Sequence, residues 1–168
     1  MLFSQTLPCR TQAEWRAALL MIRAARYAVI ETSGGKLRFI HIRRFPKLLA
    51  WPDFWPTTNR YHASGTADRC LLYFNQPRSC PNFLAVRYAV STCSTSYATI
   101  RAAIATLDAI AAAKQIDAIL CDAANSRLSD RLLARQGWEK HKPQRWHRNF
   151  IKRFYGEYPT VSLPLTTN

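Results

Sequence analysis

The stretch "CDAANSRLSDRLLARQGWEKH", residues 121–141, joins the end of an apolar run to a short basic helix and then to a Gly-Trp turn. The apolar run "IDAILCDA" ends just before Asn125, and a short continuous run of this kind predicts a strand covered on both faces. Leucines then recur at helical spacing as far as Gly137, a residue typical of a helix C-terminus. The stretch therefore predicts a buried strand, a short helix and a sharp turn.

The neighbouring segments extend this pattern in both directions. "YATIRAAIATLDAIAAAKQ" (97–115) is Ala-rich with one apolar face, which predicts a long helix. "RCLLYFNQPRSCPNFLAVRYAVST" (69–92) predicts a strand pair before it, and "GWEKH" and "RWHRNFIKRF" predict a closing strand pair after it. The second half therefore contains a strand–helix–strand unit.

The first half begins with a capping box, Thr11 followed by Glu14, which predicts an amphipathic helix over 12–26. "YAVIETSGGKLRFIHI" predicts a hairpin around Gly34-Gly35. Residues 43–68 contain three prolines and several aromatics without a clear period, which predicts an irregular loop. Such a loop belongs either to a site or to the cover of a core edge.

These elements predict a single α/β (α+β) domain over residues 1–156, with a mixed, mostly antiparallel sheet flanked by helices. Residues 157–168 are predicted to be a C-terminal tail.

The formal net charge is +14 and the pI is about 10.2. This charge favours anionic partners, either nucleic acid, a phosphorylated cofactor or an acidic membrane surface, or it marks a generally basic soluble protein. No apolar run approaches the length of a membrane span.

Five widely spaced cysteines form no C-x-x-C motif, and the four histidines show no metal-ligand spacing, so no metal site is predicted. The odd cysteine count suits a reducing compartment, and "MLFSQTLPCR" lacks the features of a signal peptide. A cytoplasmic location is therefore expected.

Half of the charge excess is concentrated near the C-terminus, where residues 127–153 hold nine Lys/Arg and two Asp/Glu, a net +7 (9 − 2). Arg127, Arg131 and Arg135 are four apart, on one predicted helix face. Aromatic residues interleave with the charges, which suits stacking on nucleic-acid bases. Period-two alternation in "RWHRNFIKRF" offers the other interpretation, with apolar residues facing the core and basic ones facing water.

The element order over residues 69–154 resembles the GNAT N-acetyltransferase superfamily, most closely in "AANSRLSDRLLARQGWEKH". The resemblance implies acetyl-CoA as cofactor, an amine as acceptor, and direct attack of the amine on the thioester. It implies that Asn125 meets the pantetheine and phosphate end of the cofactor, and that Gly137-Trp138 forms the family's Gly-aromatic turn. The basic residues Arg127 and Arg131 would assist cofactor binding.

Two positions depart from the family pattern. The Gly-rich loop that holds the pyrophosphate reads "STCSTSYAT" here, without glycine. Ser94, Thr95 and Ser96 could offer hydroxyls instead, and weak cofactor affinity is expected. The family's Tyr proton donor falls at Leu133, so the catalytic residues are not identified.

Each candidate also has a structural interpretation. Asn125 is either a pantetheine ligand or a helix N-cap, and Ser94, Thr95 and Ser96 are either phosphate donors or caps. Glu31 and Asp68 are candidate bases, but neither has a visible partner, which predicts that both face solvent.

Two functions follow from the sequence. The first is an acyl-CoA-dependent N-acyltransferase, or a degenerate relative that binds acyl-CoA poorly. The alternative is a non-enzymatic basic protein that binds nucleic acid through residues 127–153.

Overall fold

The computed structural model describes residues 3–45, 67–123, 129–142, 148–160, 162–163 and 165. Its elements follow the chain as β1 Phe3–Pro8, α1 Gln12–Ala24, β2 Tyr27–Ser33, β3 Lys36–Arg43, β4 Arg69–Asn75, β5 Phe83–Ser91, α3 Tyr97–Lys114, β6 Ala118–Asp122, α4 Asp130–Arg135, β7 Glu139–Lys140 and β8 Asn149–Arg153. The loop predicted at 43–68 lies outside the described residues except at its two ends.

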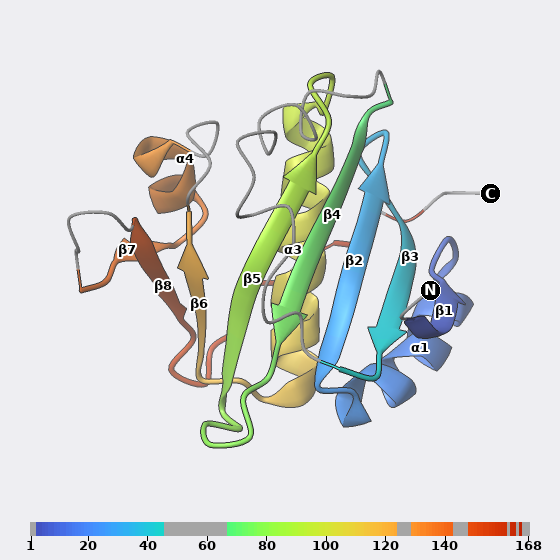
Figure 1. The fold of residues 1–168 in the computed structure, drawn as a ribbon, viewed down its shortest axis with the longest axis horizontal. Coiled ribbons are helices and arrows are strands. Elements are labelled where there is room, and N and C mark those ends of the chain that lie inside the picture. Colours follow the sequence, from blue (N-terminus) through green and yellow to red (C-terminus); the bar gives the residue numbers. More distant parts are fainter. Residues whose placement is uncertain are drawn as a thin grey trace.

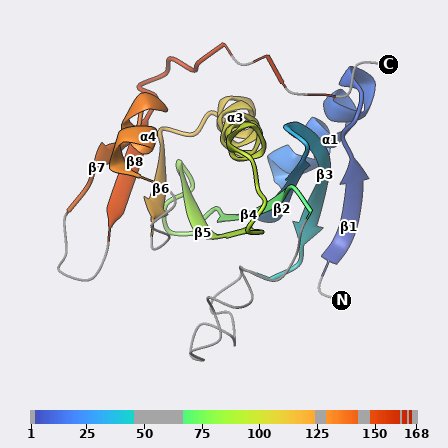
Figure 2. The same cartoon turned by 90° about the horizontal axis from the view of Figure 1, so that it is seen from above.

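Eight strands form one sheet in the order β1-β3-β2-β4-β5-β6-β8-β7 (Figure 1). Every neighbouring pair is antiparallel except β5 and β6, which are parallel. Helix α3 crosses the middle of one face, with α1 and α4 to its two sides (Figure 2). The prediction of an α+β domain with a mixed, mostly antiparallel sheet flanked by helices is confirmed.

The first helix and hairpin form as the sequence predicts. Thr11 Oγ1 accepts from the Glu14 backbone at 3.3 Å, and Glu14 Oε2 accepts from the Thr11 backbone at 3.1 Å, so the capping box is complete. Gly34 and Gly35 both have positive φ, which only glycine adopts without strain. An added Cβ on Gly35 would lie 3.3 Å from Ala98 Cβ, so the turn packs closely against the start of α3.

Strand β1 is not predicted by the sequence pattern. Its register follows β3, with Thr6 opposite His41 and Leu7 opposite Ile40. Among the described residues β1 pairs only with β3, so it is an edge strand. Edge strands tolerate polar residues such as Gln5 and Thr6, and this weakened the apolar signal on which the prediction depended.

Helix α3 supplies the centre of the core. Leu107, Ile110 and Ala111 are fully buried within the main hydrophobic cluster. At its C-terminal end, Lys114 Nζ donates to the carbonyls of Ile22, Arg23 and Ala25 at 2.8–2.9 Å, which fastens α3 to the end of α1. These bonds satisfy carbonyls that a helix terminus leaves unpaired.

Helix α4 begins one turn later than the sequence suggests. Its N-cap is Ser129, whose hydroxyl accepts from the Leu132 backbone at 3.2 Å, so Asn125 is not the cap of this helix. Gly137 ends the helix region with φ +80°, and an added Cβ there would lie 3.4 Å from Lys152 Cε. The positive φ of Gly137 therefore makes the turn, and the Lys152 side chain packs beside it.

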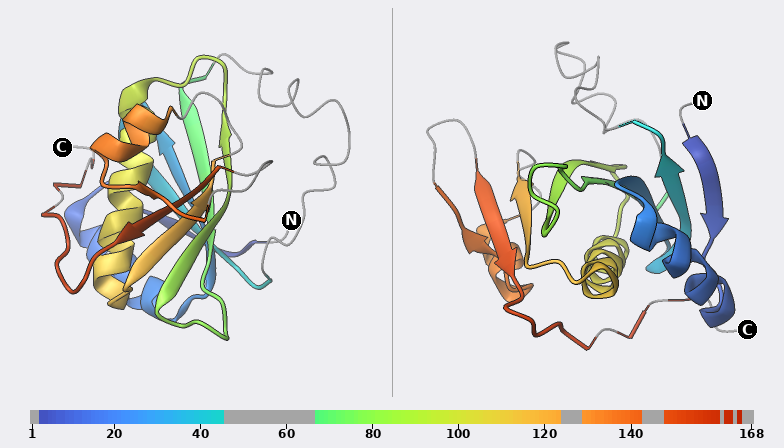
Figure 3. Two further views of the ribbon diagram at one scale, coloured as in Figure 1. Left: turned by 90° about the vertical axis from the view of Figure 1, so that its left-hand side faces the viewer. Right: turned by 90° about the horizontal axis from the view of Figure 1, so that it is seen from below.

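The chain after β8 returns across the helical side of the sheet (Figure 2 and Figure 3). The Tyr158 hydroxyl donates to the Ile116 carbonyl at 3.1 Å. Tyr158, Leu163 and Leu165 pack against the core cluster. The described part of the predicted tail 157–168 therefore contributes to the fold.

Candidate functional site

The parallel strands β5 and β6 separate part of the way along β5 (Figure 1). Their register runs from Phe83 opposite Ala118 to Val86 opposite Cys121, whereas β5 continues to Ser91. The β4–β5 register shifts at the same place, so Arg87 is an extra residue in β5. A bulge bends its strand, which accounts for the divergence of β5 from β6.

Residues 88–91 of β5 pair with β4 on one side only among the described residues, and the bulge residue Arg87 precedes them. Their backbone groups on the β6 side form a strand edge, the kind of surface that accepts an extended, amide-bearing chain. The edge lies beyond the carboxyl end of β6 and before α3, and ligands of open α/β sheets bind in the crevice outside the carboxyl ends of parallel strands. We call residues 87–91 the β5 edge.

Two polar side chains lie on the sheet face opposite α3 at the place where β5 and β6 diverge, which we call the opening. Tyr88 lies opposite Tyr73, and their ring centroids are 6.2 Å apart. Asp122 is the last residue of β6 and is exposed. Neither residue stands out in the sequence, because alternation along single strands does not show which strands diverge.

The hydroxyl-rich loop before α3 is bonded within the protein. Ser96 is the N-cap of α3, and its hydroxyl accepts from the Thr99 backbone at 3.2 Å. Thr95 Oγ1 donates to the Arg69 carbonyl at 2.7 Å, while Ser94 is exposed. Ser96 and Thr95 thus perform structural roles of the kind that the capping interpretation describes.

Asp68 sits at the N-terminus of α3, and the prediction that it faces solvent without a partner is wrong. Its carboxylate accepts from the Ser96 backbone and from the Ser96 hydroxyl, both at 2.8 Å. Burial opposes ionisation, but the hydrogen bonds from Ser96 and Thr99 hold the pKa of Asp68 below its ordinary value. A fixed negative charge therefore occupies the positive end of the α3 dipole.

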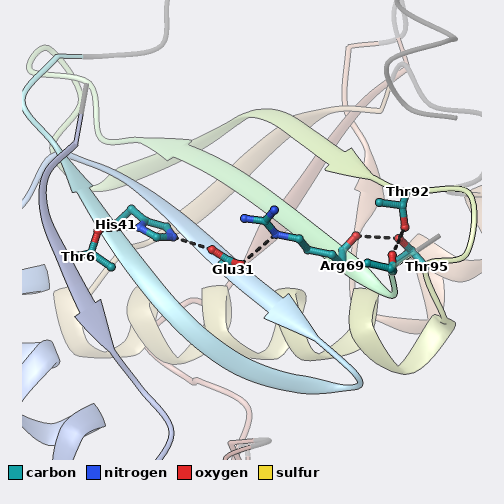
Figure 4. A network of polar contacts seen from close by, with 7 residues as sticks. Thr6, Glu31, His41, Arg69, Thr92 and Thr95 are labelled. Carbon is teal, nitrogen blue, oxygen red and sulfur yellow. Dashed lines mark hydrogen bonds and ion pairs between the residues drawn. The ribbon is translucent and has the colours of Figure 1, made fainter. Parts of the chain in front are cut away.

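A second polar network crosses the sheet face opposite α3 (Figure 4). His41 Nε2 lies 2.7 Å from Glu31 Oε2, and Arg69 Nε lies 2.9 Å from Glu31 Oε1. Thr6 Oγ1 lies 3.0 Å from His41 Nδ1. Because a carboxylate only accepts, Nε2 carries a proton, and in the neutral ring Nδ1 accepts from Thr6.

Glu31 was predicted to face solvent, and this is wrong because its side chain is only 13% exposed. The hydrogen bond from His41 lowers the pKa of Glu31, burial opposes this, and Arg69 lowers the pKa further. The partners come from β3 and β4, distant in sequence, and this is why the sequence did not reveal them.

The Glu31 network should stabilise the protein at neutral pH. The pKa of Glu31 is lower in the folded state, so its contribution is present above the unfolded value and is lost as the pH falls through the folded value. Glu31→Gln should cost roughly 1–3 kcal/mol at pH 7, as expected for hydrogen bonds to a charged group. The difference from wild type should shrink below about pH 4.5 in urea unfolding.

Exposed Glu157, changed to Gln, serves as the matched control and should leave the unfolding free energy almost unchanged. A difference for Glu31→Gln that stays constant from pH 7 to pH 3 would contradict an ionised Glu31 in this role.

Glu31 and His41 are too far from the β5 edge to act there directly. Glu31, Leu71 and Val90 lie in one row across β2, β4 and β5, which places Glu31 two strand spacings, about 10 Å, from the edge. His41 is on β3, one strand farther, about 14 Å away. We therefore assign this network to fixing β1, β3 and β4 in place.

The basic segment differs from its sequence pattern at Lys152. Its side chain is 9% exposed and bonds Asp108 of α3 at 2.7 Å, so the prediction that the basic residues of β8 face water is wrong here. Phe150 and Phe154 are buried as predicted. Burial raises the pKa of Asp108, and Lys152 opposes this effect.

Arg131 and Arg135 are exposed on α4, consistent with one basic helix face. Arg127 and Asn125 lie outside the described residues, as does Trp146. His141 is half-buried beside β7. Across the described residues no group of three His, Cys, Asp or Glu side chains could hold a metal ion.

No helix in the described part of the chain is long and apolar enough to cross a membrane. In comparisons with known proteins, no family model, no curated protein and no solved structure matches the chain.

Proposed function

We propose that the chain is an acyltransferase that takes an acyl group from a pantetheine thioester such as acetyl-CoA and transfers it to an amine. The β5 edge carries this proposal, because it is a strand edge that opens between two parallel strands next to the start of a long helix. A pantetheine arm is an extended chain with two amides, so it can bond such an edge as an added strand. Its thioester carbonyl would accept from a β5 backbone N–H.

The residues at the opening supply the remaining chemistry. The amine nitrogen attacks the thioester carbonyl carbon, the carbon–sulfur bond breaks, and the amide forms. Asp122 accepts the proton that the amine loses, and the Tyr88 phenol protonates the departing thiolate. Both side chains lie on the same sheet face, from the two strands that border the opening.

The earlier candidates have unequal support. Arg131 is exposed on α4 and can attract an anionic donor, whereas Thr95 and Ser96 already bond within the protein. Asn125 and Arg127 remain predictions. A degenerate relative would bind the donor and show no transfer.

Nucleic-acid binding is the second candidate, because Arg131, Arg135 and Lys142 are exposed and form no ion pair among the described residues. Much of the remaining charge in this region is already paired. Asp130 pairs with Lys140 at 2.8 Å and with Arg148 at 2.5 Å, and Glu139 pairs with Arg153 at 2.6 Å. The local field available to phosphates is correspondingly smaller.

Calorimetry at physiological salt separates the two functions. We expect acetyl-CoA to bind with an affinity weaker than micromolar and to raise the melting temperature by mass action. A single-stranded oligonucleotide should bind weakly. No thermal shift at millimolar acetyl-CoA, together with oligonucleotide binding that falls by about 0.7 log units per log unit of salt for each phosphate contacted, would favour the nucleic-acid function.

A further inference from the structure

On the basis of the proposed function, we propose that the natural donor is an acyl-pantetheine arm presented by an acidic carrier protein rather than free acyl-CoA. Both donors share the thioester and the two amides that suit the β5 edge. They differ in what lies beyond the arm. Free CoA brings a nucleotide with a diphosphate, whereas a carrier brings one phosphate and a protein surface.

The start of α3 is poorly suited to a diphosphate. A nucleotide diphosphate beside the loop at 92–96 would meet the free N–H groups of the helix N-terminus, where anions bind most readily. The Asp68 carboxylate already holds that position through two 2.8 Å hydrogen bonds from Ser96. A diphosphate there would face a like charge within the same helix turn.

Apart from that of exposed Ser94, the hydroxyls in and next to the loop are also committed to the protein. Thr92 Oγ1 donates to the Ala67 carbonyl, and Thr95 Oγ1 donates to the Arg69 carbonyl. Thr99 Oγ1 accepts from the Gly35 backbone at 2.7 Å. Binding a diphosphate would require several of these bonds to break, in a loop that has no glycine.

The surface charge suits an acidic protein partner. Three elements around the opening carry exposed arginine, with Arg87 on the β5 bulge, Arg101 on α3, and Arg131 and Arg135 on α4, whereas β6 contributes the acidic Asp122. The chain as a whole has a net charge of +14. Complementary charge accelerates encounter between proteins and fixes their relative orientation, which a tethered arm needs to reach the edge.

Four probes test the proposal by binding to the full chain at low salt. They are acetyl-CoA, S-acetyl-pantetheine, an acidic acyl carrier protein bearing an acetyl-phosphopantetheine arm, and the same carrier without the arm. We expect the carrier that bears the acetyl-phosphopantetheine arm to bind at least about tenfold more tightly than both acetyl-CoA and the carrier without the arm. S-acetyl-pantetheine should bind at least as tightly as acetyl-CoA.

The Asp68→Asn variant tests whether the Asp68 charge is what weakens the binding of the CoA diphosphate. Asn keeps an oxygen that accepts from Ser96 but removes the charge, so acetyl-CoA should bind about tenfold more tightly while S-acetyl-pantetheine is unchanged. Asp117→Asn makes the same change near the other end of α3, where Asp117 accepts from Asn82, and should alter neither affinity. The four-probe comparison stands if Asp68→Asn fails to fold.

The outcomes separate this proposal from the proposed function. If acetyl-CoA binds as tightly as the carrier that bears the acylated arm, the carrier proposal is overturned and the acyltransferase function stands. If the carrier without the arm binds as tightly as the one with it, the carrier proposal is also overturned. Failure of all three thioesters to bind would overturn both.

Discussion

Lys152→Met should lower the free energy of unfolding by about 3–5 kcal/mol, because it leaves the Asp108 carboxylate buried without its partner. The side chains of Lys152 and Asp108 are only 9% and 6% exposed, and no other hydrogen bond to Asp108 exists among the described residues. The double variant Asp108→Leu, Lys152→Met should recover most of the loss, since apolar side chains fit a buried site without desolvation cost. Urea unfolding measures the free energy of unfolding of the wild type, of Lys152→Met and of the double variant.

Arg153→Met is the matched control, one residue along the same strand. Arg153 pairs with Glu139, whose side chain is 64% exposed, so its loss should cost no more than about 1 kcal/mol. A loss for Lys152→Met as small as that of Arg153→Met would show that the buried pair contributes nothing particular. A double variant no more stable than Lys152→Met would show that packing, rather than charge, explains the cost.

Tyr88→Phe should reduce the rate of acyl transfer about 100-fold while leaving the donor dissociation constant unchanged, as expected when a general acid is lost. The change removes only the phenolic hydroxyl and keeps the ring that packs against Tyr73. Steady-state and single-turnover transfer from acetyl-CoA to an amine, with calorimetry for donor binding, separate the two effects.

Tyr155→Phe removes the same group from a side chain that is 82% exposed, and it should transfer at the wild-type rate. Asp122→Asn should also slow transfer, because it removes the carboxylate that accepts the proton from the amine. A Tyr88→Phe enzyme with full activity would exclude Tyr88 as the acid. Equal losses in rate and donor affinity would indicate a role in binding instead.

Local sequence patterns predicted most of the fold. Thr11 and Glu14 mark the first helix, Gly34-Gly35 marks the hairpin, and alanines mark α3, because these signals act over a few residues. The edge strand β1 was missed because an edge does not require an apolar pattern. The late start of α4 was missed because Asn125 and Ser129 are both good caps and only the folded chain chooses between them.

The site was less predictable because its contacts connect distant parts of the chain. Glu31 meets His41 and Arg69 only once three strands are aligned, and Asp68 meets Ser96 only when β4 lies beside the start of α3. Alternation in β8 predicted that Lys152 faces water, but Lys152 shares a strand face with buried Phe150 and Phe154. The sequence could not show that Asp108 of α3 pairs with Lys152 there. The Arg87 bulge depends on pairing with β4 and leaves no mark on the β5 sequence alone.

Amide hydrogen exchange across the β5 edge tests the central claim most directly. S-acetyl-pantetheine and acetyl-CoA should each slow exchange at those residues of 87–91 whose backbone N–H points away from β4, where the arm bonds the backbone. Strand β1 is also an edge strand among the described residues, and its exchange should stay unchanged as an internal control. Slowed exchange confined to residues 87–91 is the predicted result. Saturating thioester that leaves these amides unprotected, or protects only residues 129–153, would contradict the account.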